Sequence, residues 1–580
     1  MRLGLDHEFA ARRGAAQPVA LFDPHGPHFT GALRTAGACA GRGRVGGVRI
    51  LIFHGYLLGG TGSNVYNARL AAALARLGHE VHLLCQERHP ERLGFIDAAG
   101  DWDGGELSLE QLAPRPGSAG GGAPGGRVTT YRPELGGLLP VYVADRYEGL
   151  EARTFARCSE AELAAYVAAN VAAVREVAAL ARPEAALANH LVMGPLILAR
   201  ALAGEVPYAV KVHGSALEYT VKAEPERFLA AAREGLAGAR AVLVGSRHTA
   251  ISLWQALGDP DLPGRTRLGP PGVDVEHFAP REGEAAAAGV RALAARLSAE
   301  PAPAPPLGGA PSAFDRDGPG AGRALGRLEP GSDVLVAYVG KLILSKGVDL
   351  LLAAWPLVLE QVPRARLVIV GFGAYREGFE RLTAALAAGD LEQALRIARA
   401  GRALEGEADP GRGLRHLIAF LEGLAGEERA RYQAAATVLG ERVLMTGRLD
   451  HEELAELLPA CAALVAPSTF PEAFGMVAAE AAACGALPVC ARHSGLAEVA
   501  GVLARAIPAE AAGWLSFPVE DGAVRALAGC LTGWLGAPEA LRADVREGLV
   551  RTVRERWSWE GVAAGVIAAA RGELDALACP

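Results

Sequence analysis

Two carboxylates eight residues apart follow an apolar stretch in the second half of the chain. Glu472 and Glu480 lie in the segment STFPEAFGMVAAEAAACG, which follows the predicted strand Ala463–Ala466. We expect a helix to begin near Phe474, so the backbone N–H groups of its first turn have no partner within the helix and point outward. Such a helix start attracts an anion, for example a diphosphate. Two acids at this spacing fit general acid/base chemistry, or alternatively a helix-capping acid and a surface acid.

The glycine at the start of this helix lets a ligand approach the backbone closely, because it has no side chain. We therefore predict that the amides of Gly475, Met476 and Val477 bind the anion. Glu480, about two helical turns beyond Glu472, should lie beside the ligand rather than against it.

Two lysines lie five residues apart where a second apolar stretch, Val334–Val339, gives way to a loop. Lys341 and Lys346 both precede a predicted helix that begins after Gly347. Two ammonium groups in such a loop can hold both phosphates of a nucleoside diphosphate and stabilise the charge that develops as it departs. The alternative is a pair of solvated surface lysines, the usual state of this residue.

The first half of the chain contributes a glycine-rich loop and a histidine. The loop, GGTGSN from Gly59 to Asn64, follows the predicted strand Val48–Phe53 and opens a helix. It lacks Gly-Lys-Ser/Thr and is therefore not a Walker loop; a tight turn with a helix cap at Ser63 or Asn64 is the simple interpretation. His213 ends the predicted strand Tyr208–His213 and should point at the same cleft, or else be a buried histidine with satisfied hydrogen bonds.

Taken together, these segments closely resemble the signature of the family 4 (group 1) glycosyltransferases, which are retaining enzymes of the GT-B fold. The resemblance implies that Glu472 contacts the donor sugar and that Glu480 binds the nucleotide ribose. It also implies contacts to the donor phosphates and sugar from the backbone of the helix start, at Phe474, Gly475, Met476 and Val477.

The same resemblance extends to the other segments. It implies that the loop residues Gly59, Gly60, Thr61 and Asn64 lie near the donor phosphates and the acceptor, that His213 contacts the donor sugar or the acceptor, and that Arg448 and Leu449 lie near the nucleobase. Lys346 matches the usual lysine of the family. Lys341 stands where the family usually has arginine, and a lysine cannot reproduce the bidentate fork of arginine.

The implied activity is transfer of a sugar, with retention, from a nucleotide-diphosphate sugar to an unidentified acceptor, which is a small metabolite, a lipid-linked glycan or a polysaccharide. Glu472, Lys346 and His213 are the predicted catalytic residues. We expect no cofactor beyond the nucleotide-sugar co-substrate and no metal. Because no second carboxylate is identifiable as a nucleophile, same-face attack through an oxocarbenium-like ion pair is the favoured mechanism.

Apolar strands alternate with amphipathic helices along the chain, which predicts an α/β protein with mostly parallel sheets. The remaining strand candidates are Glu80–Cys85, Ala185–Asn189, Ala241–Gly245, Arg366–Val370, Val443–Thr446, Leu487–Cys490 and Trp514–Phe517. Together with the resemblance, this alternation predicts the GT-B architecture: two Rossmann-like domains whose parallel sheets face a central cleft.

We expect the chain to be divided as follows: residues 1–46, a disordered leader or a mis-assigned start; 47–299, an acceptor domain containing a mobile loop at Gly117–Arg127; 300–331, a Pro/Gly-rich linker; 332–550, a donor-binding domain with a helical insertion at 375–441; and 551–580, a helix that crosses back to the first domain. The linker assignment rests on the crowding of proline and glycine.

Composition narrows the classes of function. The 580 residues include 65 acidic and 58 basic side chains, a net charge of −7 that argues against a dedicated nucleic-acid binder. The eight cysteines are scattered without a C-x-x-C pair, so structural zinc and a disulfide framework are both unexpected. No uninterrupted apolar run reaches about 18 residues. We therefore expect a cytoplasmic protein of unknown oligomeric state, with a peripheral membrane contact left open.

Three competing functions remain. Gly371-Phe372-Gly373 follows a predicted strand as a dinucleotide fingerprint should, which would indicate an NAD(P)-dependent oxidoreductase, but the third glycine is missing. A GT-B nucleotide-sugar epimerase and a non-catalytic partner subunit share the expected cleft.

Three D-x-D sequences, Asp101–Asp103, Asp259–Asp261 and Asp315–Asp317, lie in Gly/Pro-rich sequence that we expect to form loops rather than strand ends, so we predict no metal there.

Overall fold

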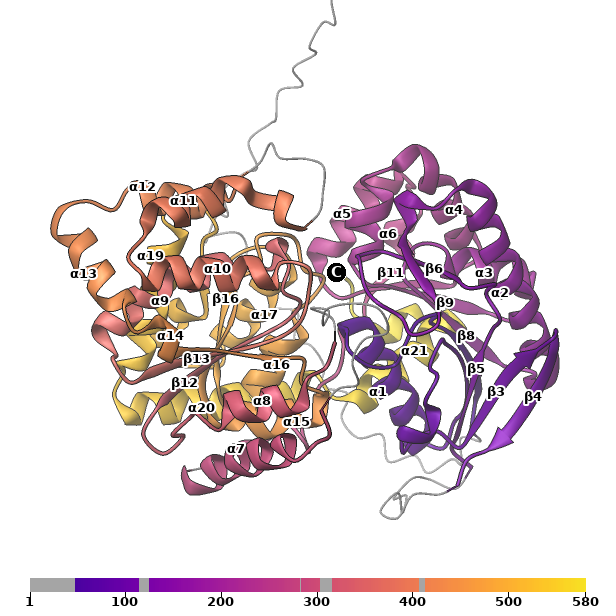
Figure 1. Cartoon of the computed structure of the whole chain (residues 1–580). Helices are drawn as coiled ribbons and strands as arrows, with labels where there is room; N and C mark the ends of the chain where they lie inside the picture. The colour runs from indigo at the N-terminus through magenta and orange to yellow at the C-terminus, as the bar shows by residue number, and fades with distance from the viewer. Residues whose placement is uncertain (1–46, 114–124, 282, 303–314, 406–412) are drawn as a thin grey trace, which may run out of the picture. The chain divides into compact units, whose positions relative to one another are not determined.

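The computed structural model describes residues 47–113, 125–281, 283–302, 315–405 and 413–580. Residues 47–580 form one compact unit, and two sheets organise it (Figure 1). The predicted leader, residues 1–46, lies outside the described residues, as does most of the loop predicted at 117–127. Arg127 itself begins a strand.

A nine-stranded sheet forms the centre of what we call the first lobe. Its strands, in order across the sheet, are β11 (Thr266–Leu268), β10 (Ala241–Val244), β9 (Tyr208–Val212), β8 (Ala185–Asn189), β1 (Arg49–Phe53), β2 (Glu80–Leu84), β5 (Arg127–Arg132), β3 (Ala98–Asp103) and β4 (Glu106–Gln111). All neighbours are parallel except the hairpin β3–β4. A separate parallel pair, β6 (Leu138–Val141) and β7 (Glu151–Thr154), flanks the loop that carries Asp145.

The second lobe is built on a six-stranded, wholly parallel sheet. Its strands, in order, are β14 (Val443–Gly447), β13 (Ala365–Val370), β12 (Val334–Val339), β15 (Cys461–Ala466), β16 (Leu487–Ala491) and β17 (Ser516–Phe517). The apolar runs that predicted these strands are buried on both faces, as parallel sheets covered by helices require.

Helices cover the faces of both sheets. Those of the first lobe are α1 (Gly62–Arg76), α2 (Glu160–Ala181), α3 (Gly194–Leu202), α4 (Pro225–Ala237), α5 (Arg247–Leu257) and α6 (Leu262–Arg265). Those packed with the second sheet include α7 (Gly283–Ser298), α8 (Gly318–Leu325), α9 (Val348–Gln361), α15 (His451–Leu457), α16 (Met476–Ala483), α17 (Ser494–Ala504), α18 (Ala509–Ala512), α19 (Ala523–Leu535) and α20 (Glu539–Arg556).

The hydrophobic cores place the division between the lobes earlier than the sequence predicts. Val273 and Phe278 already belong to the core of the second lobe, and so do the buried residues of α7. The predicted linker 300–331 is not wholly extended, because α8 lies inside it and packs against α7. Helices α7 and α8 both bury apolar residues in the second-lobe core, which an extended linker would not do.

The last helix, α21 (Trp559–Arg571), returns to the first lobe, where it packs beside α1 and against β8 and β9. Figure 1 shows this yellow segment among the indigo and purple elements of the first lobe. The chain crosses at Trp557–Trp559, after α20 has completed its packing on the second lobe. The crossing is therefore later than the predicted residue 551.

Where the sequence predicted an insertion, the described residues between β13 and β14 form five α-helices: α10 (Arg376–Ala387), α11 (Leu391–Ala400), α12 (Arg415–Glu422), α13 (Gly426–Ala436) and α14 (Leu439–Arg442). Their buried faces join the core of the second lobe; Tyr432, for example, donates a hydrogen bond to the carbonyl oxygen of Ala353 on α9.

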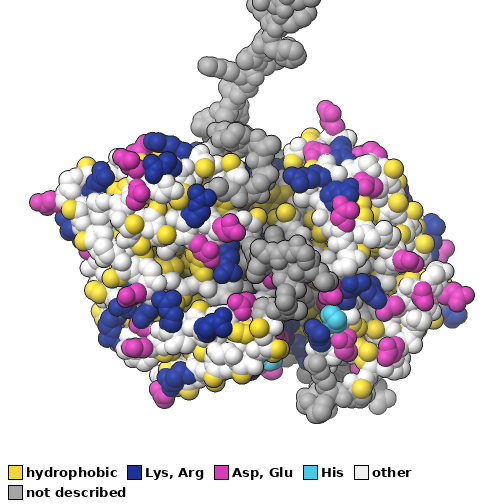
Figure 2. Space-filling model, in the orientation of Figure 1, with side chains coloured by type: hydrophobic (Ala, Val, Ile, Leu, Met, Phe, Trp, Pro, Cys, Tyr) yellow, Lys and Arg dark blue, Asp and Glu magenta, His cyan; other side chains and the backbone are white. Residues whose placement is uncertain are grey.

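Asp101 and Asp103 belong to strand β3 rather than to the predicted loop. Strand β3 lies next to the edge strand β4, and Asp101 pairs with Arg132. Helix α2 is long and apolar enough, by length and composition, to cross a membrane. One such helix is weak evidence, and α2 packs its buried face, including Leu163 and Val174, into the first-lobe core. Figure 2 shows cationic and anionic side chains interspersed over the visible face.

Candidate functional site

A cavity of about 1100 Å³ is lined by residues of both lobes. Every predicted site residue contributes to its lining: Gly59, Gly60, Thr61, Asn64, His213, Lys341, Lys346, Arg448, Leu449, Glu472, Phe474, Gly475, Met476, Val477 and Glu480. The carboxyl ends of parallel strands in both sheets open onto it, which is where open α/β sheets bind ligands. The structure thus brings together residues up to 421 positions apart, Gly59 and Glu480.

The start of α16 forms one wall of the cavity. Its N-cap is Gly475, with a φ of +117°, and a β-carbon there would lie 2.6 Å from the Leu496 side chain. Only glycine fits this position without strain. Among the described residues no acceptor contacts the amides of Met476 and Val477, so these donors are available to an anion. The helix begins at Met476, two residues after Phe474, because Gly475 has a left-handed backbone conformation and cannot be part of the helix.

Glu472 and Lys346 form an ion pair at the floor of the cavity. The carboxylate Oε1 also accepts a hydrogen bond of 2.6 Å from the Ser468 hydroxyl. Burial disfavours the charged amine of Lys346, but the adjacent Glu472 carboxylate, its hydrogen bond and Tyr219 outweigh that cost and raise the pKa of Lys346. The lysine therefore stays cationic and can pair with an anion in the cavity.

The backbone around Glu472 is fixed by its neighbours. Its amide donates to the Ser494 hydroxyl at 2.9 Å, and its carbonyl accepts from the Gly495 amide. His493 contacts both the Ser494 hydroxyl, at 3.1 Å, and the carbonyl oxygen of Ser468, at 2.7 Å. These hydrogen bonds fix the backbone from which the Glu472 side chain extends into the cavity.

Glu480 is buried, with 3% of its surface exposed, and its Oε1 lies 3.5 Å from Nε2 of His451. Burial raises the pKa of Glu480 to about 7. Burial also lowers the pKa of His451 to about 3, so this histidine is neutral. Glu480 therefore lines the cavity as a group that can donate or accept a hydrogen bond near neutral pH.

The other predicted cations are already paired. Lys341 Nζ lies 2.7 Å from Oδ2 of Asp145, which comes from the first lobe. Arg448 lies 3.4 Å from Oδ1 of Asp450 and over the Phe372 ring. The buried Leu449 packs into the second-lobe core. Sequence reasoning missed Asp145, because nothing local distinguishes an aspartate 196 residues away from its partner.

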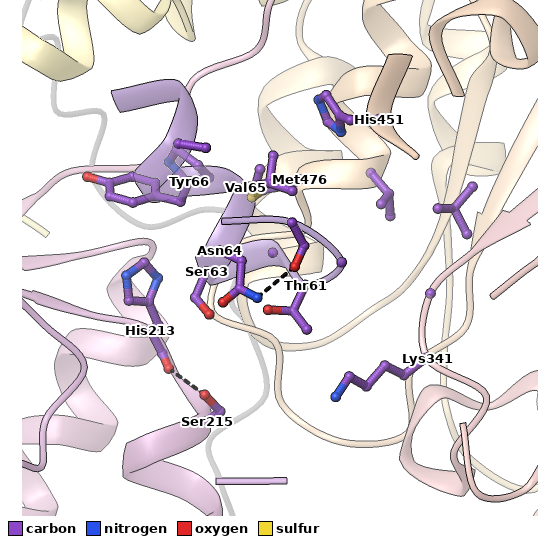
Figure 3. A pocket seen from close by; sticks show the side chains of 18 of the residues that line it. Thr61, Ser63, Asn64, Val65, Tyr66, His213, Ser215, Lys341, His451 and Met476 are labelled. Atoms are coloured by element: carbon purple, nitrogen blue, oxygen red, sulfur yellow. Dashed lines mark hydrogen bonds between the residues drawn. The ribbon is translucent and has the colours of Figure 1, made fainter. Parts of the chain in front are cut away.

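The glycine-rich loop approaches the second lobe closely. A β-carbon on Gly60, whose φ is +86°, would lie 3.4 Å from the Arg448 guanidinium carbon. The helix cap is Thr61, without a side-chain cap bond, rather than Ser63 or Asn64. Asn64 instead folds back and donates to the Gly59 carbonyl at 2.7 Å. Figure 3 shows Thr61, Ser63 and Asn64 between His213 and Lys341.

His213 lies across the cavity from Lys341 (Figure 3). Its Nε2 lies 2.8 Å from Oδ1 of Asn189, and its ring packs edge-on against Tyr66. Burial, followed by the charges of His190, Lys211 and His54, lowers the pKa of His213 well below its usual value, so it is neutral. His190 and Lys211 also line the cavity and were not predicted. Burial lowers the pKa of Lys211 to about 7.

The dinucleotide fingerprint has a packing explanation. A β-carbon on Gly371 would lie 1.9 Å from the Gly340 carbonyl oxygen, and one on Gly373 would lie 2.6 Å from that of Leu342. Both glycines let two loops of the second lobe pass in contact. Within the residues that the structure describes, no three His, Cys, Asp or Glu side chains gather to hold a metal ion.

Comparisons with known proteins agree on a family. The family model described as "Glycosyl transferases group 1" matches residues 327–391 and 418–514. The one described as "Glycosyl transferase 4-like domain" matches residues 61–261. A D-inositol 3-phosphate glycosyltransferase of Segniliparus rotundus is 29% identical over 259 residues, 44% of this chain and 43% of that relative. This match spans less than half the length of the relative.

Solved structures show the same fold. Sucrose-phosphate synthase from Thermosynechococcus elongatus superposes with a TM-score of 0.53 at 20% identity, covering 91% of this chain and 100% of that one. Anabaena HepE in complex with UDP and glucose superposes with a TM-score of 0.50 at 15% identity, covering 91% and 100%.

Proposed function

The chain belongs to the group 1 glycosyltransferases of the GT-B fold, and we propose that it takes its sugar from a nucleotide-diphosphate donor. We further propose that it transfers this sugar with retention of the anomeric configuration. The donor binds mainly to the second lobe, and the acceptor mainly to the first. The observation that carries this proposal is the convergence on one cavity of the free α16 amides and the Lys346–Glu472 pair. The printed title of the HepE structure, with UDP and glucose bound, supports the donor class.

The proposed reaction assigns each group a task. The bond between the anomeric carbon and the diphosphate oxygen breaks, and an acceptor oxygen bonds to the same face of that carbon. The acceptor proton passes to the departing phosphate. Lys346, Lys341 and the amides at the start of α16 stabilise the negative charge on that phosphate. Glu472 positions Lys346 and faces the donor sugar, while His213 contributes a hydrogen bond from the first lobe.

No metal is needed for this scheme, since ammonium groups and helix amides supply the positive field. Exclusion of water by the two lobes limits hydrolysis of the donor. The acceptor class stays open among small metabolites, lipid-linked glycans and polysaccharides.

A thermal-shift panel of uridine, guanosine and adenosine diphosphate sugars, with NAD(P) included, tests the donor class. A ligand present at 100 times its Kd adds about 2.7 kcal/mol to the free energy of unfolding. Stabilisation by NAD(P) alone would overturn the proposal in favour of an oxidoreductase. With the best donor, mass spectrometry separates transfer from epimerisation of the donor, and NMR of the product reports its anomeric configuration. An inverted product would refute retention.

A further inference from the structure

Four buried side chains of the first lobe connect His213 to the glycine-rich loop. They are Asn189 on β8, Asn67 and Asn64 on α1, and His54 just after β1; each has 3% or less of its surface exposed. The sequence analysis singled out only Asn64 among them. Buried polar side chains are costly unless every donor and acceptor is paired, so their pairing is informative.

Backbone carbonyls fix the orientation of each amide. Asn64 Nδ2 donates to the Gly59 carbonyl at 2.7 Å, so its Oδ1 is an acceptor. Asn67 Nδ2 donates to the Ser63 carbonyl at 2.8 Å, which makes its Oδ1 an acceptor as well. Asn189 Nδ2 donates to the Phe53 carbonyl at 3.2 Å, with the same consequence. A carbonyl oxygen accepts but never donates, so none of these amides can be reversed without losing a bond.

The histidine protons then follow. His54 Nε2 lies 3.1 Å from the Leu57 carbonyl and 3.0 Å from Asn64 Oδ1, both acceptors, so Nε2 carries the proton. Burial lowers the pKa of His54 to about 4, which makes the ring neutral. Its Nδ1 is therefore a bare acceptor, and it takes a hydrogen bond of 3.0 Å from Asn67 Nδ2.

The remaining two links reach the cavity. Asn67 Oδ1 accepts from Asn189 Nδ2 at 2.7 Å. Asn189 Oδ1 in turn accepts from His213 at 2.8 Å, so the proton of His213 is on Nε2. His213 Nδ1 has no partner among the described residues and is not one of their buried unpaired atoms, so it opens to the cavity that the ring lines.

We propose that Asn189, Asn67 and His54 are positioning residues that hold His213 in its Nε2–H tautomer, so that Nδ1 presents a lone pair to a hydroxyl group of the donor sugar or the acceptor. The same chain of hydrogen bonds reaches the Gly59 carbonyl through Asn64. It therefore connects the glycine-rich loop to His213. A wrong tautomer would offer a proton where the site needs an acceptor. The assignment of the bound hydroxyl rests on the proposed function, whereas the tautomer itself does not.

The direct test is ¹⁵N NMR of the histidine-labelled full chain, with the His213 signals assigned through His213→Gln. The wild-type protein should show a protonated Nε2 and an unprotonated Nδ1 at His213, without any substrate. A protonated Nδ1 in the wild-type protein would overturn the proposal, and this outcome requires no variant to fold.

Two variants break the pairing at different places. Asn67→Asp preserves the shape of the side chain but replaces the donor to His54 Nδ1 by an acceptor, so His54 should gain a proton on Nδ1. Asn189→Ala removes the acceptor for His213, whose single ring N–H proton should then distribute over both nitrogens. The matched control is Asn170→Ala, because Asn170 is as buried and donates to the Tyr166 carbonyl, but lies outside this network. It should leave both histidines unchanged.

Kinetics provide the second readout. Asn189→Ala should lower turnover of the identified donor by between about tenfold and 100-fold, the range expected for misplacing a group at the reacting centre. Binding of the nucleoside diphosphate, measured by calorimetry, should not change, because these residues do not contact the second lobe. The positioning role would be refuted if His54 in Asn67→Asp and His213 in Asn189→Ala both kept their wild-type tautomers, even if transfer were observed. An altered tautomer without any donor turnover would retain the tautomer assignment and refute the proposed function.

Discussion

Lys341 Nζ lies 2.7 Å from Asp145 Oδ2, an ion pair in which each lobe contributes one side chain, about 15% exposed. The pair lies at the cavity wall where the diphosphate of a donor is proposed to bind. A phosphate oxygen and the Asp145 carboxylate therefore compete for one ammonium group. Partial burial strengthens this competition, because water screens the charges less than at an open surface.

Replacing Asp145 should strengthen nucleotide binding. Asp145→Asn removes the competing charge while keeping the shape, so the Kd of a nucleoside diphosphate should fall about tenfold, the scale of one charged hydrogen bond. Calorimetry with the nucleotide that stabilises the wild-type protein most would measure this. Glu148→Gln, in the same loop, is the control, since the Glu148 side chain is 76% exposed. An unchanged Kd for Asp145→Asn would show that phosphate does not reach Lys341.

The ion pair at the cavity floor should control turnover. Lys346→Ala and Glu472→Ala should each lower the transfer rate on the order of 100-fold, the cost of losing one electrostatic contact in the transition state. Steady-state kinetics with the identified donor would measure the effect. Lys222→Ala is the matched control, because Lys222 forms an ion pair with Glu218 within the first lobe. Near-normal turnover in either test variant would remove the role assigned to that residue.

The glycine-rich loop allows a cleaner separation of strain from function. Gly60 and Gly204 have nearly the same left-handed φ, +86° and +83°, but only Gly60 faces another group, Arg448. Alanine at either position should destabilise the fold by about 1–2 kcal/mol through backbone strain. Gly60→Ala should in addition weaken donor turnover, whereas Gly204→Ala should not. Equal turnover in both, at equal melting temperature, would exclude a close approach of ligand to the loop.

Asp349 should make stability depend on pH. Its carboxyl is 4% exposed at the start of α9, and burial raises its pKa to about 7. Between about pH 4 and 7 the folded state therefore holds a proton that the unfolded state has lost, so stability falls as pH rises through this window. Asp349→Asn cannot ionise. The difference in melting temperature between this variant and the wild type should therefore grow in favour of the variant as the pH rises to 7.

The slope that remains in Asp349→Asn should come partly from Glu480, whose pKa is also raised to about 7. The exposed Asp544 supplies the control, because Asp544→Asn should leave the pH profile unchanged. Parallel profiles for the wild type and Asp349→Asn would mean that Asp349 is not buried as an uncharged acid.

Local sequence patterns predicted the interior of both sheets well, because strands such as Val334–Val339 are apolar on both faces and begin and end at turn residues. The patterns missed β3, β4 and β5 at one end of the first sheet, β11 at its other end, and the separate pair β6 and β7. The β4 strand ELSLEQ is polar and exposed at the sheet edge, so it lacks the apolar run that marks a buried strand. A helix cap at Ser63 or Asn64 was the simple interpretation of the glycine-rich loop, but the cap is Thr61, and the Asn64 side chain donates a hydrogen bond back to Gly59.

For the candidate site, the residues found from sequence lie in short segments where a strand meets a helix, as Glu472 and Lys346 do. Those missed, Asp145 and Asn189, act through partners that folding brings from 196 and 122 residues away. No spacing rule connects such pairs, because the order of strands in the sheet determines which loops meet. The sequence therefore indicates the residues of the anion site better than the residues that position them.

The return of α21 to the first lobe has a consequence for how the chain folds during synthesis. Trp559, Val566 and Ala570 are part of the core that covers one face of the first sheet, together with Leu70 and Leu74 of α1. The part of this face that α21 covers therefore stays open to water until the ribosome has made α21, although the strands beneath it emerge much earlier. The first lobe thus completes its burial only after the second lobe has been translated.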